Sequence, residues 1–384
     1  MQSKLLGSWM SVFARRLRSI APVAVVLGAL RWAIAPLTAH AADQAPFTPL
    51  PEPMKVNEAS ARVGAVLFFD NRLSGDTGNS CATCHNPAKG WSDGQPLSTG
   101  YTSVDYFRKS PSLFDVAYRR YLMWDARLDG ADLDTAVRDM ITDAHTMNAD
   151  TRLVQQRLKQ VPEYVKMFED AFGPGDPYGG KIYGAVAAFL KTIRTRNAPF
   201  DKYLRGDKKA LTEQQLDGMK LFAGNANCIA CHYGPTLSDG KVHALGVSDN
   251  PELATNAGRQ ISMLRFYAVM GTPNYMNLRT DVGNYVVTKD NMDIGKFLTP
   301  LLWDVGQKRP YMHSGIFRTL DEVVDFYDRG GGDRLNKDPL LKPLRLTASE
   351  KKALVAFLQS LTGDGPKVEA PKTFDYQIRE LGKN

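Results

Sequence analysis

The 384-residue sequence lacks the features that mark several classes of protein. Four cysteines in so long a chain do not make a small disulfide scaffold, and 32 glycines are too few for collagen. With 43% hydrophobic and 23% charged residues, the composition is that of a globular chain and excludes a disordered one. A charge excess is also missing: five of the 48 basic residues precede Asp43, the first acidic residue, and the remainder carries a net charge of only +2. The composition therefore predicts no nucleic-acid partner.

The first 41 residues have the pattern of a secretory signal peptide. A basic segment ending at Arg18 precedes an eleven-residue apolar run from Ile20 to Leu30, and residues 39–41 form an A-x-A cleavage site. The apolar run is too short to cross a bilayer core of about 30 Å as a helix, and no other stretch is apolar enough. We therefore predict cleavage after Ala41 and a periplasmic mature chain without a membrane span.

The four cysteines form two C-x-x-C-H motifs, and none is left over. This motif attaches a c-type haem, because its two thiols form thioethers with the porphyrin vinyl groups while the adjacent histidine binds the iron. The alternative is two redox C-x-x-C pairs or half zinc sites, which would require a histidine after both pairs by chance. The sequence predicts two covalently attached c-type haems, held by Cys81, Cys84 and His85 and by Cys228, Cys231 and His232.

Helix signals recur along the chain and strand signals are poor, so the expected fold class is all-α. Capping boxes predict helix starts at Thr212, Thr319 and Thr347. The last of these helices has a one-sided apolar pattern that ends before Gly363. A weak internal repeat, residues 64–68 and 218–222, precedes the two haem motifs and indicates two domains built alike.

These signals predict two cytochrome c-like haem domains with long irregular loops, covering residues 42–200 and 201–384. A helix over residues 182–193 is expected to close the first domain. The Pro/Gly-rich segments 173–180 and 197–206 are predicted turns or linkers. Segments 86–115 and 234–315 are predicted to be irregular and to pack on the porphyrins.

Over roughly residues 55–365 the chain resembles the bacterial diheme cytochrome c peroxidase family, and most closely its MauG-like branch. The resemblance is carried by residues 123–127 (MWDAR), 310–315 (PYMHSG) and 319–327. It implies a peroxidatic N-terminal haem domain, an electron-transfer C-terminal haem domain, and hydrogen peroxide as substrate.

Tyr327 distinguishes the branches of the family. It lies fourteen residues after His313, where the reductively activated peroxidases have a methionine ligand and MauG-like enzymes have tyrosine. A phenolate is a hard anionic ligand that favours ferric and higher states. The resemblance therefore implies that Tyr327 binds the second iron. The alternative is a core aromatic on the same helix face as Val323 and Val324.

Two further positions concern the first haem. The family's resting-state loop histidine corresponds to Tyr101, which implies an open iron site unless Tyr101 itself binds the iron. The family's distal glutamate corresponds to His145. An imidazole can take a proton from bound peroxide and return it to the leaving oxygen, so we expect His145 to keep the acid–base role. The alternatives are that His145 is a sixth iron ligand or lies on a surface loop.

Trp124 matches the family's tryptophan between the two haems, where an indole can pass oxidising equivalents; the alternative is an ordinary core tryptophan. His243 and His313 fall at family positions near the haems, and we expect both to be structural hydrogen-bonding residues. The family's interdomain calcium is doubtful here, because Lys109 and Lys308 occupy the corresponding positions and ammonium groups repel a hard dication. A lysine ammonium could take the place of the ion.

The sequence therefore predicts an exported diheme enzyme, similar to MauG, with His145, Trp124 and Tyr327 as its catalytic residues. Hydrogen peroxide would generate a high-valent oxidant shared by both irons, which would oxidise a residue of a partner protein, a Trp in this branch, at long range. One alternative is a peroxidase that reduces hydrogen peroxide with electrons from a small cytochrome or cupredoxin. Another is a diheme electron carrier without catalysis.

Overall fold

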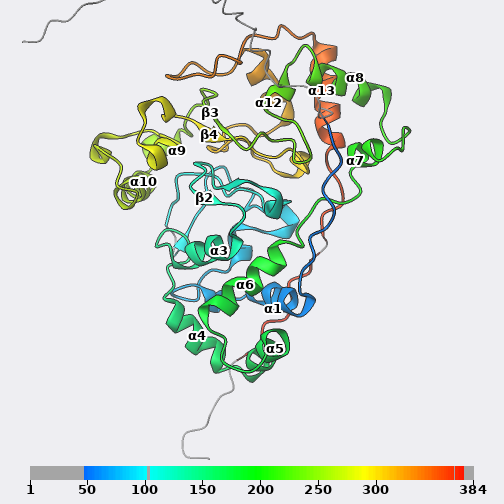
Figure 1. Cartoon of the computed structure of the whole chain (residues 1–384). Coiled ribbons are helices and arrows are strands. Elements are labelled where there is room, and N and C mark those ends of the chain that lie inside the picture. Colours follow the sequence, from blue (N-terminus) through cyan, green and yellow to red (C-terminus); the bar gives the residue numbers. More distant parts are fainter. Residues whose placement is uncertain (1–46, 102–103, 367, 376–384) are drawn as a thin grey trace, which may run out of the picture. The chain divides into compact units, whose positions relative to one another are not determined.

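The computed structural model describes residues 47–101, 104–366 and 368–375 (Figure 1). The predicted signal peptide and its cleavage site lie outside the described residues. Among the described residues, no helix combines the length and apolar content needed to cross a membrane. The described residues belong to one compact unit by their contacts, so the domain boundary near residue 200 stays a prediction.

The fold is rich in helix, as the sequence predicts, and its described strands are only two residues long. The strands form two antiparallel pairs, β1 (Tyr121–Leu122) with β2 (Leu128–Asp129) and β3 (Val242–His243) with β4 (Phe297–Leu298). The helices, in chain order, are α1 (Glu58–Phe68), α2 (Cys81–Cys84), α3 (Leu133–Thr142), α4 (Thr151–Lys159), α5 (Pro162–Phe172), α6 (Gly179–Leu190), α7 (Pro199–Leu204), α8 (Glu213–Ala223), α9 (Glu252–Thr255), α10 (Ala257–Val269), α11 (Tyr285–Thr288), α12 (Leu320–Asp328) and α13 (Ala348–Ser360).

The internal repeat appears as two equivalent helix pairs, α1 with α6 and α8 with α13. A Cβ atom on Gly64 of α1 would lie 1.9 Å from the carbonyl oxygen of Ala185 in α6. Likewise, a Cβ atom on Gly218 of α8 would lie 2.0 Å from the carbonyl oxygen of Ala353 in α13. Glycine is required at both places because the helix backbones touch there. Each haem motif therefore follows a helix that is fixed by the same kind of close contact.

The predicted helix starts are confirmed. Thr212, Thr319 and Thr347 are the N-cap residues of α8, α12 and α13, each with both hydrogen bonds of the capping box. The helix predicted over residues 182–193 is α6, which begins three residues earlier and ends at Leu190.

Two predicted irregular segments contain helices. Residues 197–206 include α7, and residues 234–315 include α9, α10 and α11. Helix α10 begins at Asn256, whose side chain accepts hydrogen bonds from the backbone N–H groups of residues 258 and 259. Its buried face, which includes Phe266 and Tyr267, packs on Phe107. This long-range contact has no local sequence signal, which is why the prediction was wrong here.

The buried core forms two larger clusters, and the chain passes from the first to the second between Ile193 and Ala198. Both ends of the described chain are exceptions, because each packs on the cluster formed mainly by the other half of the sequence. The buried residues of the first cluster run from Val63 to Ile193, and those of the second are Leu50 and members from Ala198 to Leu361. Phe47 lies beside Phe357 of α13, where Figure 1 shows the first described residues in dark blue. At the other end, Val368 and Phe374 pack against the first cluster.

Gly64→Ala is expected to lower the free energy of unfolding by about 1–3 kcal/mol, because the new methyl group forces α1 away from α6. Gly184→Ala is the matched control: Gly184 also lies in a helix of this core, but its nearest obstacle to a Cβ is the carboxylate of Asp134 at 3.4 Å. This control should be neutral or stabilising by roughly 0.5–1 kcal/mol. Urea unfolding of both variants is the measurement, and equal midpoints would contradict the backbone contact.

Candidate functional site

The first C-x-x-C-H motif opens onto an apolar cavity of about 1370 Å³, including its mouth. The short helix α2 presents Cys81 and Cys84, and Thr83 Oγ1 accepts the backbone N–H of Ser80 at 3.0 Å, which fixes the start of this helix. Helices α3 and α6 line this cavity with seven apolar residues, namely Leu133, Ala136, Val137, Met140, Ile141, Val186 and Leu190. An apolar cavity beside two cysteines fits a covalently held porphyrin.

The cysteines of the motif are free, and its histidine uses one ring nitrogen for a hydrogen bond. Neither cysteine is in a disulfide, and burial raises the pKa of Cys81 to about 12 and of Cys84 to about 11. These are neutral thiols, unlike the low-pKa thiolate of a redox C-x-x-C pair. The Nδ1–H of His85 donates to the carbonyl oxygen of Trp91 at 3.2 Å, and burial lowers the pKa of His85. The neutral imidazole therefore keeps Nε2 free for an iron.

His145 lies in the wall of this cavity, in the loop between α3 and α4. It is buried, so the surface-loop alternative is wrong. Its Nδ1 lies 3.1 Å from Asp143 Oδ1, and its Nε2 is buried without a hydrogen-bond partner in the described chain. A buried nitrogen with a free lone pair normally finds a partner, so Nε2 marks a place for a ligand.

Tyr101 is not among the described residues that line the first cavity. Its ring lies beside Gly75, where it would come within 3.1 Å of an added Cβ. This placement gives no support to Tyr101 as an iron ligand, and the open first site stays a prediction.

The second motif opens onto a similar apolar cavity of about 1560 Å³. Cys228, Cys231 and His232 lie in a 3₁₀ turn and the residues just after it. The Nδ1–H of His232 donates to the carbonyl oxygen of Leu237 at 2.8 Å, and burial lowers the pKa of this histidine. Burial also raises the pKa of Cys228 to about 12. The second site thus repeats the first, with two cysteines outside any disulfide and a histidine whose Nε2 is free.

Tyr327 lies in the wall of the second cavity with its helix neighbours Leu320, Val323 and Val324. Burial raises the pKa of its phenol, and Cys228 and Cys231 add to this effect. The structure therefore brings Tyr327 and the second haem motif to one cavity. Iron ligation by Tyr327 stays a prediction.

Trp124 is the only described residue that lines both cavities. Its indole N–H donates to the carbonyl oxygen of Lys109 at 2.9 Å, and its own carbonyl accepts the N–H of Leu298 at 2.8 Å. Its ring lies edge-on to His313, with 6.5 Å between the ring centroids. Trp124 is half-buried and held from both sides, which suits a bridge between two redox groups.

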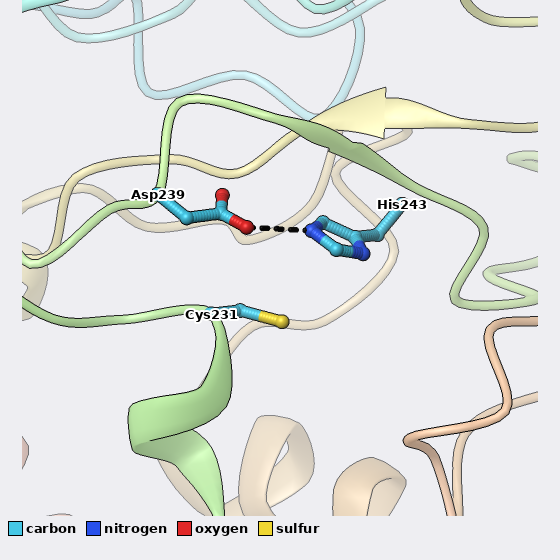
Figure 2. A group of neighbouring side chains, drawn as sticks. All are labelled: Cys231, Asp239 and His243. Carbon is cyan, nitrogen blue, oxygen red and sulfur yellow. Dashed lines mark hydrogen bonds and ion pairs between the residues drawn. The ribbon is translucent and has the colours of Figure 1, made fainter. Parts of the chain in front are cut away.

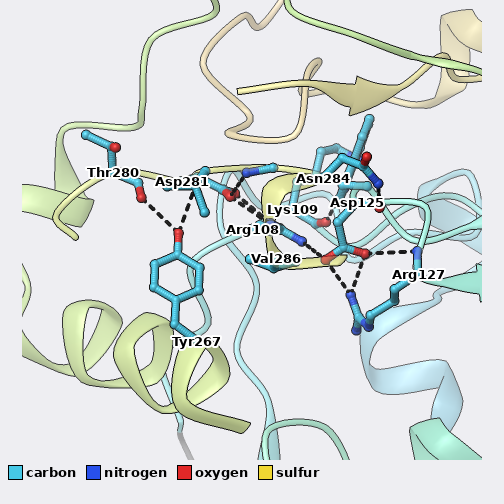
Figure 3. Close-up of polar contacts among 12 residues, drawn as sticks. Arg108, Lys109, Asp125, Arg127, Tyr267, Thr280, Asp281, Asn284 and Val286 are labelled. Atoms are coloured by element: carbon cyan, nitrogen blue, oxygen red, sulfur yellow. Dashed lines mark hydrogen bonds and ion pairs between the residues drawn. The ribbon is translucent and has the colours of Figure 1, made fainter. Parts of the chain in front are cut away.

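A buried ionic cluster fixes the segment that carries Trp124 (Figure 3). The guanidinium of Arg108 donates twice to Asp281, at 2.5 and 2.7 Å, and once to Asp125 at 2.5 Å. Arg127 donates to both oxygens of Asp125, at 3.0 and 2.9 Å. Two positive and two negative groups balance here, so no buried charge is left unpaired. The cluster joins the residue after Trp124 to the segment that follows α10.

His243 is held between two carboxylates, and Figure 2 shows one of them, Asp239. Its Nε2 lies 2.8 Å from Asp239 and its Nδ1 lies 2.6 Å from Asp338, which confirms it as a structural hydrogen-bonding residue. Cys231 lies close to Asp239 and His243, and the spacing of the three side chains would allow them to bind a metal ion. However, Cys231 belongs to the haem motif and both ring nitrogens of His243 are engaged, so we assign no metal to this cluster.

His313 behaves differently from the prediction. Its ring stacks on Phe297 with 3.5 Å between centroids, and no side-chain hydrogen bond of His313 is found in the described part of the chain. Burial lowers the pKa of His313 to about 4, so it is a neutral ring in the wall of the second cavity. The prediction of a hydrogen-bonding role is therefore not confirmed for His313.

The two lysines at the family's calcium positions point at oxygen atoms. Lys109 Nζ donates to Ser92 Oγ at 2.9 Å and to the carbonyl oxygen of Ser110 at 3.1 Å, and burial lowers its pKa to about 8. Lys308 Nζ donates to the carbonyl oxygen of Leu301 at 3.3 Å, and burial and the nearby Arg119 lower its pKa. The amino groups use acceptors of the kind a hard cation needs, and the absence of calcium stays a prediction.

Comparisons with known proteins agree with this geometry. The model of a family described as di-haem cytochrome c peroxidase matches residues 58–209. A protein of Denitromonas iodatirespirans named cytochrome-c peroxidase IdrP2 is 53% identical over 348 residues, which cover 90% of this chain and 94% of that protein. The chain belongs to the di-haem cytochrome c peroxidase family.

The family also includes proteins named MauG. That of Methylorubrum extorquens is 33% identical over 325 residues, 84% of each chain. A solved structure of a MauG-like protein associated with microbial copper homeostasis has a TM-score of 0.69 and 26% identity, covering 89% of this chain and 99% of its own. These findings confirm the predicted family, and they identify this member as a haem-dependent oxidoreductase. The family implies two haems.

The sequence analysis missed Asp143, which contacts His145. The available signal was an aspartate two residues before a histidine, a spacing at which an Asx turn brings the carboxylate back to the following backbone. It also missed Tyr106, which lines the first cavity, and it gave no role to Arg127, the last residue of the motif at 123–127, which lines the same cavity.

The charge on His243 predicts a pH-dependent stability. Hydrogen bonds, first with Asp239, raise the pKa of His243 to about 11 from about 6.5 in the unfolded chain. Its contribution is therefore complete below about pH 6.5 and is lost as the pH rises through 11. We expect His243→Gln to lower the free energy of unfolding by about 1.5–3 kcal/mol at pH 6, and by less at pH 10.

The measurement is urea unfolding of the wild-type protein and the variant at both pH values. Lys241→Gln is the control, because Lys241 is exposed and also loses one positive charge next to the same strand pair. A difference that stays constant between pH 6 and pH 10 would show that His243 is not held as a cation.

Proposed function

We propose that this chain is an exported, periplasmic diheme peroxidase that reduces hydrogen peroxide to water in the first cavity. The overall step consumes one hydrogen peroxide, two electrons and two protons and yields two waters. The observation that carries the proposal is the buried, unpartnered Nε2 of His145 in the same cavity as Cys81, Cys84 and His85. Export rests on the signal-like residues 1–41.

We propose covalent attachment of a haem at each motif, because each cavity offers two free cysteines and a histidine with a free Nε2. The haem iron would supply the site at which peroxide binds and the electrons that break the O–O bond. The protein residues have the remaining tasks: excluding water, moving protons and connecting the two cavities.

His145 is assigned the proton transfer. Breaking the O–O bond heterolytically requires a base that takes a proton from one oxygen and returns it to the oxygen that leaves as water. The Nε2 atom has no other partner in the described chain, so its lone pair is free for the substrate. The apolar wall around it keeps this exchange from competing with bulk water.

His145→Ala is expected to lower kcat/KM for hydrogen peroxide by about 10²–10⁴-fold, the usual contribution of a positioned acid–base group. Stopped-flow spectroscopy of the haem protein with hydrogen peroxide measures this step directly, before any electron donor acts. An unchanged haem spectrum at rest is the check that the site remains intact. A variant that reacts as fast as the wild-type protein would remove His145 from the mechanism.

Trp124 is assigned the connection between the two cavities, through which electrons from an external source would pass. Trp124 reaches both cavities, and an indole between two redox groups can carry an oxidising equivalent. Relatives named cytochrome-c peroxidase, at 53% and 49% identity, support a small redox protein, a cytochrome or a cupredoxin, as the donor. Family membership leaves no support for the alternative of an electron carrier without catalysis.

A second candidate function is oxidation of a residue, a Trp, in a partner protein. Tyr327 favours it, because a phenolate ligand lowers the reduction potential of its haem and disfavours electron uptake from ordinary donors. The relatives named MauG, at 33% and 32% identity, show that this branch lies within the same family.

Tyr327→Met distinguishes the two candidates. Replacing an oxygen ligand by a thioether is expected to raise the potential of the second haem by at least about 0.1 V, within the roughly 0.8 V that axial ligands cover. Turnover with a reduced small cytochrome should then be kept or increased if the first function is right. Spectroelectrochemistry and steady-state assays are the measurements.

Tyr311→Phe is the control, since it removes a hydroxyl from the same cavity whose hydrogen bond goes to the carbonyl oxygen of Val305. Loss of turnover in Tyr327→Met despite a raised potential would favour the second candidate. An unaltered potential would show that Tyr327 is not a ligand.

A further inference from the structure

Asp143 holds His145 by two contacts from one oxygen atom. Oδ1 of Asp143 accepts the backbone N–H of His145 at 3.0 Å and lies 3.1 Å from Nδ1 of its ring. Asp143 is the residue at which α3 ends, so this oxygen is placed by a helix rather than by a free loop.

The turn that carries both residues is held from two sides. The carbonyl oxygen of Asp143 accepts the N–H groups of Thr146 and Asn148, each at 3.0 Å. A Cβ on Gly100 would lie 1.8 Å from the carbonyl oxygen of His145, and one on Gly75 would lie 2.4 Å from that of Asn148. The backbones thus touch at both points, and the backbone of this turn has little room to move.

The contact with Asp143 decides which nitrogen of His145 carries the proton. A carboxylate can only accept a hydrogen bond, so the neutral imidazole must carry its single proton on Nδ1. Nε2 then has a lone pair, and this is the atom that is buried in the cavity without a partner. The hydrogen bonds from His145 outweigh burial and lower the pKa of Asp143, which therefore stays ionised.

Two other titratable groups face this pair. The ring of Tyr106 lies 6.3 Å from that of His145, and burial raises the pKa of its phenol, so it is neutral. The positive charge of Arg127 favours the ionised forms of both Asp143 and Tyr106, but its guanidinium is paired with Asp125. Asp143 is therefore the only anionic group in contact with the His145 ring among the described residues.

We infer that Asp143 is a positioning residue for proton transfer: it fixes His145 as the Nδ1–H tautomer and directs the bare Nε2 at the substrate. The inference rests on the proposed role of His145 and goes beyond it. Nε2 would take the proton from one oxygen of hydrogen peroxide and give it to the other, which would leave as water when the O–O bond breaks; a haem held by Cys81, Cys84 and His85 would supply the two electrons of that cleavage. Nδ1 keeps its proton throughout, and the carboxylate offsets the charge while the ring is an imidazolium.

Three variants separate this role from simple support of the turn. Asp143→Ala removes the acceptor, and we expect kcat/KM for hydrogen peroxide to fall by about 10–100-fold. Asp143→Asn keeps an oxygen acceptor and loses only the charge, so the tautomer persists and the imidazolium is less stabilised. The acid limb of its rate–pH profile should therefore move down by about one pH unit or more. Asp150→Ala, at the N-cap of α4 on the other side of the same loop, is the matched control and should react like the wild-type protein.

The double variant Asp143→Ala/His145→Ala tests whether Asp143 acts through His145. We expect the double variant to react no more slowly than His145→Ala alone, because the loss of Asp143 has no further effect once the His145 ring is absent. If the two losses multiply instead, Asp143 acts independently of His145 and the inference is overturned.

The outcomes also separate this inference from the proposed function. If His145→Ala reacts like the wild-type protein, the acid–base role itself is wrong. If His145→Ala is slow while Asp143→Ala matches the wild-type protein, the role of His145 stands and that of Asp143 is overturned. Should Asp143→Ala fail to yield the haem protein, the pH profile of Asp143→Asn decides, and an unmoved acid limb rejects the inference.

Discussion

The ionic cluster of Arg108, Asp125, Arg127 and Asp281 is the constraint on which the region between the cavities depends. Removing one partner of such a buried pair typically costs about 3–5 kcal/mol, because the other charge is left without water or counter-charge. Each of the four groups therefore depends on the presence of the others for its charge to be balanced. Since Asp125 follows Trp124 directly, the cluster also fixes the indole that lines both cavities. Buried electrostatics, more than apolar packing, thus determines the path between the two sites.

The two C-x-x-C-H motifs have nearly equivalent structural surroundings, or frames, that carry different polar groups. Each motif follows a helix seated on its partner through a glycine, and each motif histidine gives its Nδ1–H to a backbone carbonyl. The first frame adds a carboxylate and an imidazole with one unpartnered nitrogen, while the second adds a tyrosine and an imidazole engaged on both nitrogens. A base with a free lone pair suits proton transfer, and a phenol suits control of an iron. The repeat thus explains how one architecture can serve two tasks.

The sequence predicts well what depends on neighbouring residues. The haem motifs, the capping boxes at Thr212, Thr319 and Thr347 and the paired glycines are local patterns, and the structure contains each of them. It predicts poorly what depends on distant contacts. Helix α10 was missed because its buried face is completed by Phe107, some 150 residues earlier. The contact of Asp143 with His145 is close in sequence, yet its meaning appears only when the cavity around Nε2 is known.

Each end of the described chain packs on the core cluster formed mainly by the other half of the sequence, and this affects the order in which the protein can fold. Leu50, near the start, is buried against residues that follow Ala198, whereas Phe374, near the end, packs on a cluster completed by Ile193. Domains that emerge first usually fold first. Here the first cluster can close on contiguous residues, but the segment before it must wait for the later half of the chain. Assembly is therefore not strictly vectorial, and neither cluster is fully covered until the described chain is present from Phe47 to Phe374.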